Sequence, residues 1–141
     1  MSKSKKDLEL KFERDIPASP GEVFDAWLDP NVKGNPWNFA KKHLLQAKKD
    51  GLFYWTTKET PHYGRFLEVK RPNRIRMTWM SPYTLGKEST VAVTFSKQKS
   101  GTRMKLVHTG LPNTKEGQGH KGGWNFFMDF FTNEFGKRTR K

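Results

Sequence analysis

The chain has 141 residues, the size of one domain, and its 27 lysines and arginines against 14 acidic residues give a formal net charge of +13. It has no cysteine, which excludes disulfides and thiolate chemistry and fits a cytoplasmic protein. No apolar run is long enough to span a membrane, and the basic start, residues 1–7, lacks the apolar stretch of a signal peptide, so we expect a short disordered arm there.

The first expected element is a half-buried strand over residues 8–16, where apolar and polar side chains alternate. The segment Ser19–Glu22 has the form of a helix capping box, with proline at the first helical position. A helix is therefore expected from Pro20 to about Leu28. Residues 32–40 indicate a loop or a short helix that Trp37 and Phe39 anchor.

Three hairpins are expected next, because each pair of strand-like segments flanks a turn signal. The expected strands cover residues 43–48 and 52–57, then 63–70 and 75–80, then 90–95 and 103–109. Alternation places the side chains of Ile75, Met77 and Trp79 on one face of their strand. In the segment 63–70 two residue pairs compete for the inner face, so we expect a β-bulge near Leu67.

The last expected helix is unusually aromatic. One stripe at helical spacing holds Trp124, Phe127, Met128, Phe131 and Phe135. A second stripe, Phe126 and Phe130, either packs against the helical pair or the preceding connection, or forms an exposed patch for a partner or a homodimer.

Sequential hairpins predict an antiparallel sheet, and one sheet with one aromatic terminal helix predicts that the sheet curls around that helix. We therefore expect a single α+β domain over residues 8–136, followed by a basic tail at residues 137–141.

Several segments resemble one known family. The segments 23–30 with Trp37, 64–69 with Pro72, Arg74-Ile75 and Thr78-Trp79, 91–95, 106–112 and 122–124 resemble the activator of the heat-shock-chaperone ATPase homologue-like family, in the START-like or SRPBCC superfamily. The resemblance implies the helix-grip fold, in which a curved seven-stranded antiparallel sheet wraps a long C-terminal helix and two short helices after the first strand close one end. Members of the superfamily bind lipids, polyketides or plant hormones, and some catalyse cyclisation.

The same resemblance implies an apolar cavity between sheet and helix. The candidate residues that line it for ligand binding are Phe53, Trp55, Phe66, Glu68, Trp79, Phe95, Leu106, His108, Trp124, Phe127, Met128 and Phe131, with Trp27, Trp37 and His120 near its mouth. Aromatic walls favour a flat, apolar molecule. The alternative is that these side chains fill the core and leave no cavity.

Two candidate residues carry polar groups. His108 is expected on the inner face of its strand, either as a polar contact for a ligand or as a core histidine with internal partners. If Glu68 also points inward, it needs a partner such as Arg65, Arg76 or His108, and the pair could serve acid–base chemistry or form a structural ion pair. Four scattered histidines without ligand spacing predict no metal site, and we expect no cofactor.

The sequence therefore favours a binding protein for an apolar or amphipathic small molecule, with no catalytic residue assigned. Three alternatives remain: a chaperone-ATPase-activator-like module that binds a protein, a cyclase or hydrolase that uses the cavity, and nucleic-acid binding through the basic surface with Tyr63 and Tyr83 as stacking platforms.

Overall fold

The computed structural model describes residues 7–57 and 60–139. Their elements, in chain order, are β1 (Leu8–Ile16), α1 (Pro20–Trp27), α2 (Pro36–Phe39), β2 (Lys42–Leu45), β3 (Leu52–Thr56), β4 (Pro61–Lys70), β5 (Arg74–Trp79), η1 (Pro82–Thr84), β6 (Ser89–Gln98), β7 (Gly101–Leu111), α3 (Lys115–Gln118) and α4 (His120–Thr139). The predicted basic arm lies outside the described residues except for Asp7, which forms an ion pair with Lys87.

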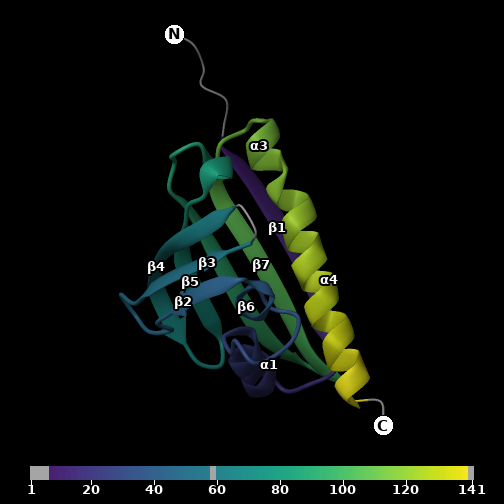
Figure 1. The fold of residues 1–141 in the computed structure, drawn as a ribbon. Coiled ribbons are helices and arrows are strands. Elements are labelled where there is room, and N and C mark those ends of the chain that lie inside the picture. The colour runs from purple at the N-terminus through teal and green to yellow at the C-terminus, as the bar shows by residue number, and fades with distance from the viewer. Residues whose placement is uncertain (1–6, 58–59, 140–141) are drawn as a thin grey trace.

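The strands form one antiparallel sheet of seven strands in the order β1-β7-β6-β5-β4-β3-β2. Figure 1 shows that the sheet is strongly curved and that α4 runs along it beside β1 and β7. This arrangement confirms the helix-grip α+β fold expected from the sequence.

Local signals explain most of these elements. The Ser19 hydroxyl accepts from the Glu22 amide and the Glu22 carboxylate accepts from the Ser19 amide, so the predicted capping box starts α1. The expected alternation in β5 to β7 holds, because each of these strands buries every second side chain on its inner face. These inner faces form the sheet side of the core.

Some boundaries differ from the expectation. The strand β2 ends at Leu45 rather than residue 48, and α4 starts at His120 and continues through residues 137–139, which the sequence assigned to the tail. The short helices α3 and η1 were not predicted. Each is a single turn and carries no hydrophobic periodicity from which it could be predicted.

The helix α4 is attached to the edge strand β1 through one arginine. The Arg14 guanidinium donates to the Asp129 carboxylate at 2.8 Å and to the Asn125 amide oxygen at 2.9 Å. Because Asn125 and Asp129 are one helical turn apart, this pair of contacts fixes the rotation of α4 about its axis.

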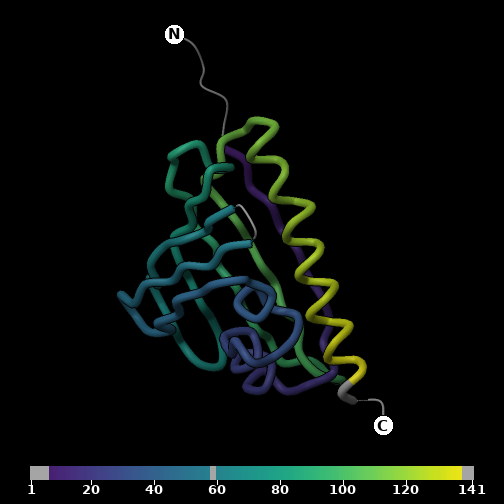
Figure 2. The backbone as a smooth tube through the Cα atoms, in the orientation of Figure 1, coloured from purple at the N-terminus to yellow at the C-terminus, as the bar shows by residue number. Residues whose placement is uncertain are grey.

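The other end of the core is closed by α1, α2 and the loop between them, which Figure 2 shows beside the C-terminal half of α4. The Trp27 and Phe131 rings meet edge to face at 5.0 Å. Gly34 has a positive φ of 109°, and a Cβ there would lie 2.6 Å from the Phe131 Cα. Only glycine permits this approach of the loop to the helix backbone.

No helix in the described parts of the chain is both long and apolar enough to cross a membrane.

Candidate functional site

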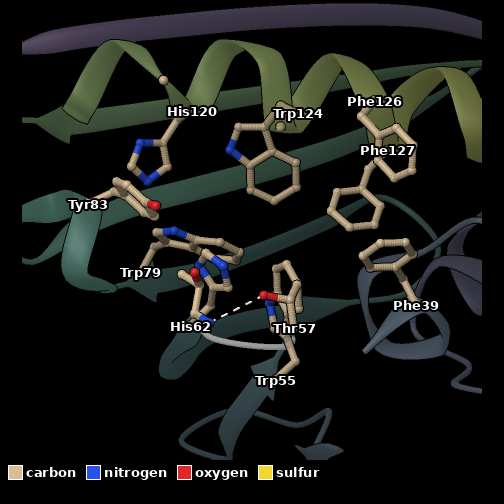
Figure 3. A pocket seen from close by; sticks show the side chains of 13 residues that line it. Phe39, Trp55, Thr57, His62, Trp79, Tyr83, His120, Trp124, Phe126 and Phe127 are labelled. Atoms are coloured by element: carbon tan, nitrogen blue, oxygen red, sulfur yellow. Dashed lines mark hydrogen bonds between the residues drawn. The ribbon is translucent and has the colours of Figure 1, made fainter. Parts of the chain in front are cut away.

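A pocket of about 490 Å³ opens between the first turns of α4 and the part of the sheet that β3, β4 and β5 form. Figure 3 shows the aromatic side chains that surround it. Its lining residues are Phe39, Trp55, Thr57, Thr60, His62, Trp79, Tyr83, Gly119, His120, Gly123, Trp124, Phe126 and Phe127. This volume lies in the range of small-molecule sites in proteins.

Three tryptophans form the walls. Trp55, Trp79 and Trp124 come from β3, β5 and α4, and each is at most 3% exposed. Period-two alternation brings Trp55 and Trp79 to the inner face of the sheet, while Trp124 follows His120 by one helical turn. The Trp79 and Trp124 ring centroids are 5.0 Å apart, so strand and helix meet through these indoles.

Three aromatic residues form the mouth of the pocket. Phe39, Tyr83 and Phe126 are 47%, 47% and 48% exposed. The Phe39 ring meets the Phe126 ring at 5.5 Å and the Phe127 ring at 5.4 Å, so α2 contacts α4 at the rim. The second stripe of the helix, Phe126 and Phe130, therefore does not enter the core as a unit. Phe126 packs on α2 and remains half exposed, and Phe130 contacts Phe126 from the next turn of α4.

One face of α4 lines the pocket, through residues 120, 123, 124, 126 and 127. On a helical wheel Gly123 lies near the middle of this face. A Cβ added at Gly123 would have no heavy atom within 4 Å, so the missing side chain leaves open volume in the pocket.

His108 lies behind the pocket and uses both ring nitrogens. The Trp124 indole donates to His108 Nδ1 at 2.9 Å, so this nitrogen carries no proton. His108 Nε2 then donates to the Ser89 hydroxyl at 2.7 Å, and that hydroxyl donates to the Trp79 carbonyl at 2.9 Å. Burial, together with nearby His120, lowers the pKa of His108 to about 3 and keeps the ring neutral.

Two further histidines line the pocket itself. The His62 ring stacks on Trp55 with 4.1 Å between centroids, and burial, with a smaller effect of His120, lowers the pKa of His62 to about 4. His120 Nδ1 lies 3.0 Å from the Gly117 carbonyl oxygen, and burial lowers the pKa of His120 as well. Both rings are therefore expected to be neutral at pH 7.

Glu68 does not line the pocket, which corrects the sequence-based assignment. The predicted bulge is present, as a register shift between Phe66 and Glu68. It leaves Phe66 and Val69 on the inner side and turns Glu68 to the outer face, where it forms an ion pair with Arg74 at 2.9 Å. The Arg74 hydrogen bond lowers the pKa of Glu68, and no contact with His108 exists.

Most other predicted cavity residues fill the core instead. Those that do not line the pocket are Phe53, Phe66, Phe95, Leu106, Met128 and Phe131, together with Trp27 and Trp37, which were expected near the mouth. Their side chains occupy the space between sheet and helix, and the rings among them meet other core rings, as in the contacts of Trp37 with Phe53 at 5.5 Å and of Phe24 with Phe95 at 5.3 Å. The pocket therefore occupies only one end of the space between sheet and helix.

Of the predicted residues, the structure brings Trp55, Trp79, Trp124, Phe127 and His120 together around the pocket. The lining residues that the sequence did not indicate are Phe39, Thr57, Thr60, His62, Tyr83, Gly119, Gly123 and Phe126. His62 could have been found, since it shares period-two spacing with Phe66, but the predicted strand began one residue after it.

The two tyrosines considered for nucleic-acid stacking do not share a surface. Tyr83 lies at the pocket mouth, whereas Tyr63 follows the pocket residue His62 in β4 and points to the opposite face of the sheet, 43% exposed. The described residues contain no cluster of three or more histidine and carboxylate side chains that could bind a metal.

A curved antiparallel sheet closed on a long terminal helix, with an aromatic pocket at the start of that helix, defines a helix-grip domain of the START or SRPBCC type. Residues 17–136 match the family model described as "Activator of Hsp90 ATPase homolog 1-like protein", and the chain belongs to this family. A comparison with curated proteins found no match.

Solved structures share the fold. Protein MLL2253 from Mesorhizobium loti superposes with a TM-score of 0.80 at 18% identity, over 95% of this chain and 100% of that one. CalU16 from Micromonospora echinospora has a TM-score of 0.71 at 25% identity, over 92% and 76% of the two chains. DynU16, a protein of the dynemicin biosynthetic locus, has a TM-score of 0.75 at 16% identity, over 89% of this chain and 46% of that one.

Proposed function

We propose that this protein binds one flat, largely apolar small molecule in the tryptophan-walled pocket, without catalysing a reaction on it. The observation that carries the proposal is the pocket of about 490 Å³ between Trp55, Trp79 and Trp124. Buried indoles offer a ligand large areas for dispersion and stacking contacts. The ligand would enter the pocket past the half-exposed side chains at its mouth, Phe39, Tyr83 and Phe126.

Binding is favoured over catalysis by the positions of the two acid–base candidates. Glu68 pairs with Arg74 on the outer face, and His108 uses both nitrogens behind Trp124. His62 lines the pocket, but a pKa of about 4 makes its ring a weak base near neutral pH. The relationship with DynU16 supports a small molecule as the ligand, since that protein comes from a biosynthetic locus.

A fluorescence titration with N-phenyl-1-naphthylamine tests the proposal. This dye is neutral, so the net charge of +13 does not attract it. We expect saturable binding of one equivalent, and we expect Gly123→Phe to weaken it at least about tenfold, because the new ring enters the pocket at the middle of its helical face.

Gly122→Phe is the matched control. Gly122 also has no heavy atom within 4 Å of an added Cβ, but it does not line the pocket, so its variant should bind the dye like the original protein. Absence of saturable binding, or equal loss in both variants, would contradict the proposal. Circular dichroism checks that both variants fold.

A second candidate function is contact with a protein partner, as the name of the family suggests. One observation favours it: Phe39, Phe126 and Phe130 make a chain of ring contacts at the surface. Stimulation of the ninety-kilodalton chaperone's ATPase by this protein, lost in Phe126→Asp, would support this function. An ATPase rate that the protein leaves unchanged would exclude this activity.

A further inference from the structure

Four buried side-chain nitrogens in the described parts of the chain have no hydrogen-bond partner, and all four belong to residues that line the pocket. They are Trp55 Nε1, His62 Nδ1, Trp79 Nε1 and His120 Nε2. The large majority of buried side-chain polar atoms in folded proteins have a hydrogen-bond partner, and unpaired ones need an explanation. Their concentration at one pocket indicates that a ligand supplies the partners.

The roles of three of these nitrogens are fixed. An indole nitrogen is only a donor, so Trp55 Nε1 and Trp79 Nε1 each need an acceptor. His120 Nδ1 faces the Gly117 carbonyl oxygen at 3.0 Å, and because a carbonyl oxygen only accepts, Nδ1 carries the proton. In the neutral ring, His120 Nε2 is therefore an acceptor and must meet a donor.

Trp79 Nε1 and His120 Nε2 lie at the same end of the pocket. Figure 3 shows that the His120 ring extends from α4 toward the edge of the Trp79 indole that carries its nitrogen, with Tyr83 beside both rings. Trp79 and His120 are 2% and 8% exposed, so they form the inner wall, while Tyr83 is 47% exposed and belongs to the mouth. A ligand that enters past Tyr83 meets one donor and one acceptor together.

We propose, on the basis of the ligand-binding function above, that the ligand is a hydroxylated aromatic compound whose hydroxyl oxygen accepts from Trp79 Nε1 and whose hydroxyl proton is donated to His120 Nε2. A hydroxyl group is the simplest group that is both donor and acceptor. A carbonyl, an ether or a carboxylate would satisfy Trp79 alone, and an ammonium group would satisfy His120 alone. The aromatic ring of the ligand would lie against the tryptophan walls.

The test is displacement of N-phenyl-1-naphthylamine by three matched probes: 2-naphthol, 2-methoxynaphthalene and naphthalene. The first two share a ring system and an oxygen acceptor, and only 2-naphthol has the donor. We expect 2-naphthol to bind at least about tenfold more tightly than 2-methoxynaphthalene, since two hydrogen bonds to buried groups favour the hydroxyl.

Two variants assign the preference to the named atoms. In His120→Phe the preference for 2-naphthol over 2-methoxynaphthalene should fall below about threefold, with naphthalene affinity nearly unchanged. If His120→Phe does not fold, Trp79→Phe, which keeps an aromatic wall but removes the donor, should weaken both oxygen-bearing probes relative to naphthalene. His43→Phe, at an exposed position of β2, is the control and should keep the full preference.

The outcomes separate the two proposals. Equal affinities for 2-naphthol and 2-methoxynaphthalene, with the dye still bound, would overturn the hydroxyl assignment and leave the ligand-binding function in place. Such a result would follow if a water molecule or the Tyr83 hydroxyl already satisfies both nitrogens in solution. Failure of the dye to bind would overturn the proposed function, and the inference with it.

Discussion

The indole nitrogen of Trp124 in α4 donates a hydrogen bond of 2.9 Å to Nδ1 of His108 in β7. The bond joins the terminal helix to the strand that lies next to the edge strand β1. It also fixes the His108 tautomer, which lets Nε2 donate to Ser89 in β6. One hydrogen-bond chain therefore connects α4 with three strands, because Ser89 continues it to the Trp79 carbonyl in β5.

Replacing His108 should lower the stability of the fold. We expect His108→Leu to lower the free energy of unfolding by about 2–4 kcal/mol, because the Trp124 N–H stays buried without an acceptor. In Trp124→Phe that donor is absent, so the double variant should lose about 1–2 kcal/mol less than the sum of the single losses. Urea unfolding of the four proteins measures this coupling. Additive effects would show that the hydrogen bond does not join helix and sheet energetically.

The lowered pKa values predict that stability falls in mild acid. The unfolded chain protonates histidine near 6.5, whereas folded His62 takes up its proton only near pH 4 and folded His108 near pH 3. The stability that these two neutral histidines contribute is thus fully present above pH 6.5. It is lost as the pH decreases toward 4 for His62 and toward 3 for His108. Thermal unfolding at several pH values should show a shallower decline for His62→Phe than for the original protein. Parallel curves would contradict the burial of a neutral His62 ring.

The two aromatic stripes of α4 should differ in their contribution to stability. Phe131 is fully buried, so Phe131→Ala should lower the free energy of unfolding by about 3–5 kcal/mol. Phe126 is 48% exposed, and Phe126→Ala should cost less than about 1 kcal/mol while it weakens dye binding at the mouth. A loss under 1 kcal/mol for Phe131→Ala would be inconsistent with a helix gripped by the sheet.

Glu68 should be dispensable for binding. Its ion pair with Arg74 lies at the surface, where such pairs stabilise little, so Glu68→Gln should leave the melting temperature nearly unchanged. Dye affinity should stay the same, since Glu68 lies on the outer face of the sheet. A marked loss of affinity in calorimetry would return Glu68 to the candidate site.

The fold could be predicted from the sequence because its signals are local. The capping box at Ser19–Glu22, the turn at Arg71–Asn73 and the alternation in β5 to β7 each depend on neighbouring residues. The bulge near Leu67 could be predicted too, from the conflict between two residue pairs. The bulge leaves one residue of each pair, Phe66 and Val69, on the inner side, and this is why Glu68 was assigned to the wrong face.

The extent of the pocket could not be predicted, because empty volume is set by side chains from distant segments. Trp27 and Trp37 lie in the short helices α1 and α2, yet they pack into interior space that the sequence assigned to the cavity. Phe39 and Tyr83 lie in the one-turn helices α2 and η1, which are too short to show a hydrophobic periodicity. Only the folded chain brings them to the rim beside Phe126.

The contact of Gly34 with Phe131 has a mechanical consequence for the pocket. Loop backbone approaches helix backbone there, and Arg14 contacts the preceding turns of α4, so we expect the helix to be held firmly in place. Under the proposed function, we expect ligands of different size to be accommodated by rotation of the Phe39, Tyr83 and Phe126 side chains. The rim, rather than movement of the helix, should then set the largest ligand that the pocket can admit.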